Sequence, residues 1–125
     1  MVEFGKVSMS SQYSGSFPPM NAINDKGSCA IAKIGKGNWW KGEFKNGFHL
    51  ISSVRIRNRI DCCGERLAGV IVKIDDQVCG SLPENTKSGE WYTVECSSAM
   101  TGYSVTLEMA RNDYLQIAGV EVSGK

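Results

Sequence analysis

The sequence lacks several features that would define its function. It contains no apolar run near the roughly 18 to 20 residues needed to span a bilayer, so we expect no membrane insertion. A single histidine and the absence of any Cys-x-x-Cys pair argue against a zinc site. Gly-x-Ser-x-Gly and His-Glu-x-x-His motifs are missing, and we expect no enzyme. A formal net charge of +1 gives no reason to expect nucleic acid as a partner, so Arg55, Arg57 and Arg59 are interpreted as a solvated strand face.

No amphipathic helix longer than a turn or two and no internal repeat is visible, whereas short stretches of alternating apolar and polar residues recur along the chain. They predict strands over residues 4–11, 50–58, 67–74, 91–96, 103–109 and 115–122. In the last strand, Leu115 and Ile117 are out of phase with Val120 and Val122, which predicts a β-bulge at Ala118-Gly119. Six to eight short strands in 125 residues predict an all-β sandwich, with residues 1–125 forming one domain.

Two tryptophans stand together at Trp39-Trp40, where they could form either a sugar-stacking surface or part of the core. The alternation of this stretch places Trp40 and Phe44 on one face and Trp39 on the other. We expect at least one of the two rings to pack in the core, because large aromatic rings are usually well buried.

An unusual motif follows the predicted strand 50–58. Adjacent cysteines, Cys62 and Cys63, lie between Arg59 and Arg66. If their thiols are oxidised to each other, a trans peptide holds the two Cα atoms about 3.8 Å apart, which is shorter than the usual disulfide span of roughly 4.4 to 6.8 Å. The bridge must then distort the backbone, and local strain of this kind is a reason to suspect function. Five cysteines in a chain of this size favour an oxidising, extracellular compartment, although no signal peptide is visible.

The arginines of the motif are suited to binding a sugar. Each guanidinium presents several fixed N–H donors and stays charged at any working pH, so it can hold two neighbouring oxygens at once. Asp61 and Glu65 are the acids beside Arg59 and Arg66, and we expect them to orient the guanidinium groups.

The motif Arg59-x-Asp61-Cys62-Cys63-Gly64-Glu65-Arg66 resembles the sugar-binding motif of the F-type lectins (fucolectins), a branch of the discoidin-like β-sandwiches. Further matches run along nearly the whole chain: Asn21-Ala22-Ile23, Gly27-Ser28-Cys29, Asn38-Trp39-Trp40, Cys79 with Cys96, Gly102-Tyr103, Tyr114-Leu115 and Val120-Glu121-Val122.

This resemblance implies a discoidin-like jelly roll, disulfides Cys62–Cys63 and Cys79–Cys96, and a secreted lectin whose partners are glycans. It also implies that Arg59 and Arg66 bind the hydroxyls and ring oxygen of L-fucose while the vicinal disulfide packs against the sugar. Single sugar sites bind weakly, so a homo-oligomer or a multidomain parent protein is expected to supply avidity.

Three departures from the family pattern bear on function. The family's sugar-binding histidine, two residues after the counterpart of Cys29, is replaced by Ile31. A buried fucose hydroxyl facing Ile31 would lose a hydrogen-bond partner, which costs roughly 1 to 3 kcal/mol. The specificity has therefore shifted, or the domain is a protein-binding discoidin-like module or a degenerate lectin. Cys29 itself has lost its family partner near Ile117-Ala118-Gly119, which leaves either a small buried hydrophobe or a reactive or intermolecular thiol.

The third departure concerns calcium, which the family often holds in this region. Asn21, Asn24 and Ser28 match ligand positions of the family, but Gly119 stands where the family has an acid. Calcium takes six to eight oxygen ligands, usually with carboxylate charge, so Asp25 would have to compensate. The alternative is a turn held by Asx hydrogen bonds without metal.

Overall fold

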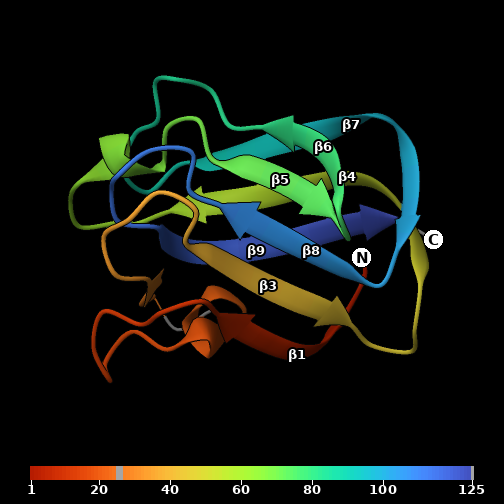
Figure 1. Cartoon of the computed structure of the whole chain (residues 1–125), viewed down its shortest axis with the longest axis horizontal. Helices are drawn as coiled ribbons and strands as arrows, with labels where there is room; N and C mark the ends of the chain where they lie inside the picture. Colours follow the sequence, from red (N-terminus) through yellow and green to blue (C-terminus); the bar gives the residue numbers. More distant parts are fainter. Residues whose placement is uncertain (25–26, 125) are drawn as a thin grey trace.

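The chain folds into two antiparallel sheets packed face to face (Figure 1). The computed structural model describes residues 1–24 and 27–124, and within them nine strands and two short 3₁₀ turns are found. One sheet has the order β1 (Phe4–Met9), β3 (Trp39–Phe44), β8 (Ser104–Glu108), β5 (Ile71–Ile74), β6 (Gln77–Ser81). The other has the order β2 (Ala30–Ile31), β9 (Gln116–Gly124), β4 (His49–Asn58), β7 (Trp91–Gly102). The turns are η1 (Pro19–Ala22) and η2 (Gly64–Leu67). The predicted all-β sandwich is confirmed.

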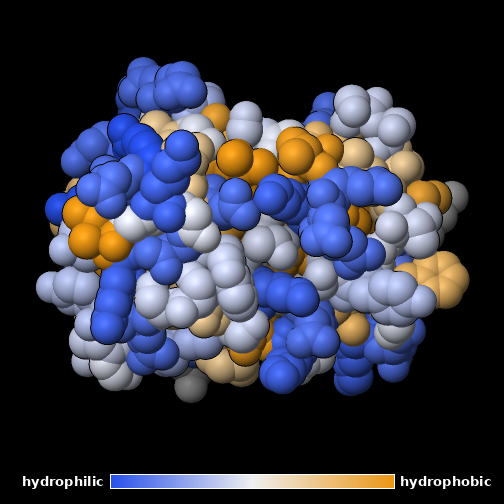
Figure 2. Space-filling model, in the orientation of Figure 1, coloured by the Kyte–Doolittle hydropathy of each residue, from blue (hydrophilic) through white to orange (hydrophobic). Residues whose placement is uncertain are grey.

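The core lies between the two sheets and contains the inward-facing residues of each strand. In β4 the alternation buries Val54 and Ile56 and leaves Arg55 exposed, as the pattern predicted. Trp40 is fully buried and packs edge-on against Phe4, with ring centroids 5.6 Å apart, which confirms the core role of this ring. Most polar side chains lie on the surface, and Figure 2 shows one face on which they surround small apolar patches.

The boundaries of several strands differ from the prediction. Residues 67–70 are not strand, since the 3₁₀ turn η2 occupies Gly64–Leu67 and β5 begins at Ile71. β7 continues to Gly102 rather than ending at residue 96, and β2 and β6 were not predicted. The predicted bulge is confirmed, because Arg57 pairs with Gly119 and Asn58 with Ile117, so that Ala118 has no partner across the strand pair.

The disulfide between the sheets and the shortness of the helices complete the description of the fold. A disulfide joins Cys79 of β6 to Cys96 of β7 and so links the two sheets. In the part of the chain that the structure describes, no helix has the length and apolar character needed to cross a membrane.

Candidate functional site

The segment that follows β4 makes a tight loop around the vicinal disulfide. Cys62 and Cys63 are bonded, with Cα atoms 3.8 Å apart. Cys63 has φ of 63° and ψ of 30°, a left-handed conformation that residues other than glycine rarely adopt. The expected distortion of the backbone is therefore found at Cys63, and η2 begins immediately after it.

A buried asparagine holds this loop in place. Asn58, fully buried at the end of β4, donates from its side-chain amide to the carbonyl oxygen of Gly64 at 2.7 Å and to that of Lys87 at 3.0 Å. Its amide oxygen accepts from the backbone N–H of Arg59 at 2.9 Å. Asn58 thus fixes both ends of the motif against the loop before β7.

Gly64 allows the two loops to approach closely. A Cβ atom at this position would lie 2.2 Å from the backbone nitrogen of Ser88, closer than any real side chain permits. The carbonyl oxygen of Gly64 also accepts from the hydroxyl of Thr86 at 2.6 Å. The conformation of the motif is therefore set by contacts with residues 86–88, more than twenty positions along the chain.

Beside this loop lies a cavity of about 200 Å3. It brings together both motif arginines, the position of the missing family histidine and several aromatic rings; its lining residues are Tyr13, Phe17, Ile31, Arg59, Arg66, Tyr114 and Gln116. Segments far apart in the sequence therefore meet at one end of the sandwich. Cys62 and Cys63, both half-buried, are not among the residues that line this cavity.

Arg59 is held by the acid that the sequence suggested. Its Nε donates to Oδ1 of Asp61 at 2.7 Å and its Nη2 to Oδ2 at 3.3 Å. This hydrogen bonding lowers the pKa of the Asp61 carboxyl and raises the pKa of the Arg59 guanidinium, so both groups stay charged. Asp61 itself lines a neighbouring cavity of about 300 Å3, which shares Arg59 and Phe17 with the first.

Arg66 has a different acid partner from the one expected. Its Nε lies 3.7 Å from Oδ1 of Asp113, and Asp113 is shared with Arg111, also at 3.7 Å. The expectation that Glu65 orients Arg66 is therefore wrong, because the exposed Glu65 instead offers its backbone carbonyl to Arg111. The Arg66 guanidinium also lies over the ring of Tyr114, 5.0 Å from its centroid, as a cation–π contact.

Gln116, like Asp113, is a residue of this site that the sequence did not reveal. It is 1% exposed, and its amide oxygen lies 2.8 Å from Nη1 of Arg66 and 3.3 Å from Nη1 of Arg59. Because a guanidinium has donors only, the amide atom that faces both of them is the oxygen. A glutamine between Leu115 and Ile117 gives no signal in the sequence, since an outward-facing polar residue is ordinary in a half-buried strand.

An apolar wall lies across the same cavity. Tyr13 packs edge-on against Tyr114 and is tilted against Phe17, with centroid distances of 5.5 and 6.1 Å. Ile31 is 2% exposed, its N–H donates to the carbonyl oxygen of Phe17 at 3.2 Å, and its carbonyl oxygen accepts from the N–H of Tyr13 at 2.8 Å. The cavity therefore combines arginine donors with aromatic and aliphatic surface.

The loop proposed for calcium is closed by amide hydrogen bonds. The Asn21 amide nitrogen donates to the carbonyl oxygens of Ser16 and Cys29 at 3.2 Å each and to the hydroxyl of Ser28 at 3.3 Å, while Asn24 donates to the Asn21 amide oxygen at 3.2 Å. Among the described residues, no group of three or more His, Cys, Asp or Glu side chains is arranged so that it could hold a metal ion. Asp25, the acid expected to compensate, lies outside the described residues, so calcium at Asn21, Asn24 and Ser28 stays a prediction.

Cys29 is a free, buried thiol next to this loop. Burial raises its pKa, an effect that the nearby Arg59 partly offsets. A raised pKa leaves less of the nucleophilic thiolate at neutral pH, which favours the buried-hydrophobe alternative for this cysteine.

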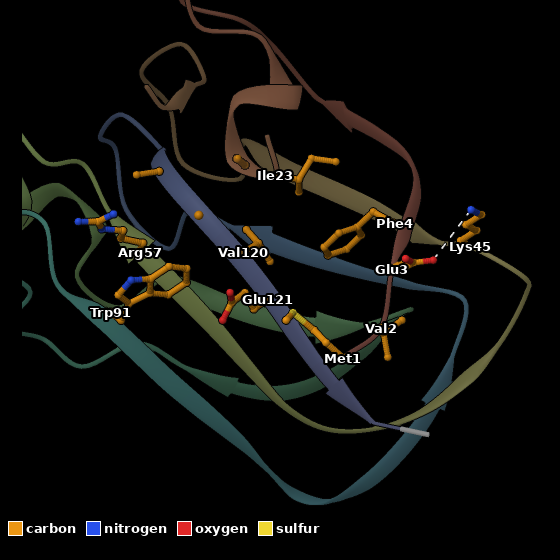
Figure 3. A pocket seen from close by; sticks show the side chains of 13 residues that line it. Met1, Val2, Glu3, Phe4, Ile23, Lys45, Arg57, Trp91, Val120 and Glu121 are labelled. Atoms are coloured by element: carbon orange, nitrogen blue, oxygen red, sulfur yellow. Dashed lines mark ion pairs between the residues drawn. The ribbon is translucent and has the colours of Figure 1, made fainter. Parts of the chain in front are cut away.

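A larger hollow, of about 740 Å3, lies along β9, between residues of β4, β7 and β9 on one side and the N-terminal residues 1–4, η1 and Lys45 on the other. Figure 3 shows Arg57, Trp91 and Glu121 over it, projecting from three neighbouring strands. The neighbouring Arg55 lies 4.6 Å from the Trp91 ring centroid and forms a 2.6 Å ion pair with Glu121, while Arg57 donates to the carbonyl oxygen of Gly89 at 3.2 Å. Arg55 and Arg57 are thus engaged within the protein, whereas Arg59, predicted with them as part of a solvated strand face, lies in the cavity beside Gln116 instead.

Comparison with known proteins identifies the class and then the family. The structure of a fucolectin from the serum of striped bass (Morone saxatilis) superimposes with a TM-score of 0.87 at 25% identity, covering 99% of this chain and 49% of that one. A fucose-binding module of Streptococcus pneumoniae has the same fold, with a TM-score of 0.79 at 17% identity over 98% of this chain and 93% of the module. The architecture is therefore that of a discoidin-like lectin domain.

Sequence similarity names the family. Fucolectin-6 of the eel Anguilla japonica is 32% identical over 136 aligned positions, which cover 95% of this chain and 72% of the relative. Fucolectin-5 of the same species is 35% identical over 78% of this chain but only 55% of its own length. The chain belongs to the fucolectins, the F-type lectins, although no protein-family model matches it. These relatives are lectins and binding modules, which agrees with the expectation that the chain is not an enzyme.

Proposed function

We propose that this chain is a carbohydrate-binding lectin domain and that the cavity between Arg59 and Arg66 is its sugar site. The observation that carries this proposal is the convergence of the two guanidinium groups on one oxygen, that of Gln116, at 3.3 and 2.8 Å, in a hollow of about 200 Å3. Such a hollow has room for one sugar ring. Two converging guanidinium groups suit the vicinal hydroxyls or ring oxygen of a pyranose better than an isolated charge.

The contacts of the arginines leave donors for a ligand. A guanidinium carries five N–H groups. In Arg59, Asp61 accepts from Nε and Nη2 and Gln116 accepts from Nη1, so each Nη retains one further hydrogen. Arg66 bonds to Gln116 through Nη1 only, so its Nη2 hydrogens remain for acceptor oxygens. In this proposal, Asp61 orients Arg59, while the disulfide of Cys62 and Cys63, which does not line the cavity, would offer rigid apolar surface only to a part of the glycan that extends beyond it.

The sugar preference of the site depends on the apolar wall of the cavity, and on Ile31 in particular. Fucolectin relatives and the fucose-binding module make L-fucose the first ligand to consider. Ile31 cannot donate or accept a hydrogen bond, so a hydroxyl directed at it would stay unsatisfied, at a cost of about 1 to 3 kcal/mol. We therefore propose a fucose-type site whose preference has moved toward sugars that direct a C–H or methyl group at Ile31.

A glycan array with free L-fucose as competitor tests the proposal, with wild type beside Arg66→Ala. Loss of hydrogen bonds to a charged group should weaken binding about 10- to 100-fold. Arg55→Ala is the matched control, because this arginine lies on the outer sheet face and pairs with Glu121. Binding that is unchanged in Arg66→Ala would refute the site. A folded wild-type protein that binds no glycan would refute the lectin function and favour the protein-binding module.

The setting of the domain is also a proposal. The chain spans little more than half the length of Fucolectin-5 and about half of the striped-bass chain, which is consistent with one domain over residues 1–125 that acts within a larger protein or an oligomer. Several linked copies would raise the avidity of a weak single site. The serum source of the striped-bass fucolectin and the two disulfides support an extracellular location.

A structural calcium in the loop of Asn21, Asn24 and Ser28 is the cofactor proposal. A bound ion that prefers the folded state would raise the melting temperature in calcium relative to EDTA. An Asp25→Asn variant should abolish that difference if Asp25 supplies the carboxylate. Equal melting temperatures in calcium and EDTA would instead support a loop closed by the Asn21 amide alone.

A further inference from the structure

Gln116 is one of four buried polar residues in the described structure, and it lies outside the apolar core. It begins β9, where its neighbours Leu115 and Ile117 are fully buried. Because successive side chains of a strand point to opposite faces, Gln116 faces away from the core side occupied by these two residues. Its burial on that side comes from the residues of the sugar cavity.

The backbone of Gln116 is fixed by its strand partner. It pairs with Ile31 across the short β2–β9 ladder, so the residue at the family histidine position and Gln116 lie directly opposite each other. The position of the amide is therefore determined by the sheet rather than by a flexible loop. A side chain on a strand is a more rigid support for a binding site than one on a loop.

The Gln116 amide oxygen accepts a hydrogen bond from one N–H of each arginine. This arrangement matters for two reasons. Two guanidinium groups close together repel each other, and an acceptor between them offsets part of that repulsion. In addition, Asp61 holds only Arg59 closely, whereas Arg66 has a 3.7 Å ion pair with an aspartate that it shares with Arg111. Gln116 lies 2.8 Å from Arg66, closer than the aspartate of that ion pair.

We propose, on the basis of the sugar-binding function above, that Gln116 is a positioning residue of the site. It holds the guanidinium groups of Arg59 and Arg66 in one relative orientation before the ligand arrives, so that their remaining N–H groups point at adjacent sugar oxygens. Gln116 does not need to touch the sugar for this effect. Preorganised donors bind more tightly because less side-chain freedom is lost on binding.

The test compares Gln116→Leu, which removes the acceptor, with Gln116→Glu, which keeps oxygen acceptors at the same place. Gln77→Leu is the matched control, since Gln77 is exposed on β6 of the other sheet. The probes are the array glycans bound by wild type, with free L-fucose as competitor. A second measurement uses no sugar: the ¹⁵N spectra of the arginine side chains, which report exchange of the Nε and Nη hydrogens and rotation of the guanidinium.

We expect Gln116→Leu to weaken glycan binding about 10- to 100-fold, the range for lost hydrogen bonds to charged groups, and to speed guanidinium rotation and hydrogen exchange in Arg66. Gln116→Glu should recover both properties, and Gln77→Leu should change neither. If Gln116→Leu does not fold, Gln116→Asn is used instead, because its amide is one methylene too short to reach both arginines.

The outcomes separate this inference from the proposed function. If wild type binds no glycan but Gln116→Leu still frees the Arg66 guanidinium, the sugar-binding function fails while the positioning role stands. If glycan binding and the arginine spectra of Gln116→Leu match wild type, and only the melting temperature falls, Gln116 is a structural residue and the inference is overturned.

Discussion

Ile31→His should raise the affinity of the domain for L-fucose. Ile31 is 2% exposed and lines the cavity together with Arg59 and Arg66. Its backbone N–H and carbonyl are both hydrogen-bonded, to Phe17 and Tyr13, so the substitution changes the side chain without freeing the strand. A neutral imidazole would bring one donor and one acceptor to a wall that is otherwise aromatic and aliphatic.

The size of the gain follows from the hydroxyl of L-fucose that would face Ile31 in the proposed site. An unsatisfied buried hydroxyl costs about 1 to 3 kcal/mol, and a histidine that bonds to it removes this cost. The affinity should therefore rise roughly 5- to 150-fold. Burial and the two nearby arginines both disfavour the imidazolium, so the pKa of the new histidine should lie below its usual value of about 6.5. The gain should be complete at neutral pH and decline as the imidazole becomes protonated in acid.

Isothermal titration with L-fucose measures this gain directly. Ile31→Leu is the control of similar volume that adds no polar atom, and it should bind as wild type does. The double variant Ile31→His with Arg66→Ala should lose most of the gain, because both side chains must contact one ligand. If Ile31→His folds and binds L-fucose no better than Ile31→Leu, the cavity does not hold a fucose hydroxyl at this wall and the site is wrongly placed.

Three further predictions concern the stability of the fold and the residues that hold the site in place. Gly64→Ala should lower the free energy of unfolding, measured in urea, by about 1 to 3 kcal/mol or more, because its Cβ would lie 2.2 Å from a backbone nitrogen. Gly15→Ala is the control and should have little effect, because Gly15 has open space around it. Equal effects of the two substitutions would contradict this prediction. The pKa of Asp61 is lowered on folding, so its ion pair stabilises the site above the usual carboxyl pKa of about 3.9 and is lost as the pH falls below it. Glycan binding should therefore weaken only in strong acid, and Asp61→Asn should remove that acid-dependent step; an unchanged step would assign it to another group. Replacing both Cys79 and Cys96 with alanine removes a disulfide between residues 17 positions apart, and should lower the free energy of unfolding by about 3 kcal/mol. An unchanged urea midpoint would disprove this prediction.

Much of the sheet structure could be predicted because burial follows a period of two. β8 falls within its predicted strand, β4 begins only one residue before its own, and the phase change in β9 located the bulge. β2 could not be predicted, because two residues are too few to show a period. β6 was missed because Val78 is exposed while Cys79 is buried, so its apolar residues do not mark one face. Leu67 and Val70 show that a buried apolar residue need not lie in a strand.

The site was predictable only in part. The resemblance to F-type lectins suggested Arg59, Arg66 and the position of Ile31, and the structure places all three on one cavity. Asp113 and Gln116 were not predicted, because each reaches the arginines through the fold and no local pattern marks either one. Glu65 was predicted as a partner from its place in the chain, but the 3₁₀ turn η2 leaves its side chain exposed. Sequence proximity thus identified one of the two acids correctly.

The bulge in β9 lets this one strand contribute side chains to both the core and the proposed site. Leu115 and Ile117 face the core before Ala118, and Val120 and Val122 face it afterwards. A regular strand that kept Leu115 and Ile117 inside would turn Glu121 into the core, where an unpaired carboxylate is costly. The extra residue lets Glu121 pair with Arg55 on the outer face while Gln116 still faces Arg59 and Arg66. One strand therefore supports both halves of the core and the arginine pair, and the orientation of the site depends on keeping that extra residue.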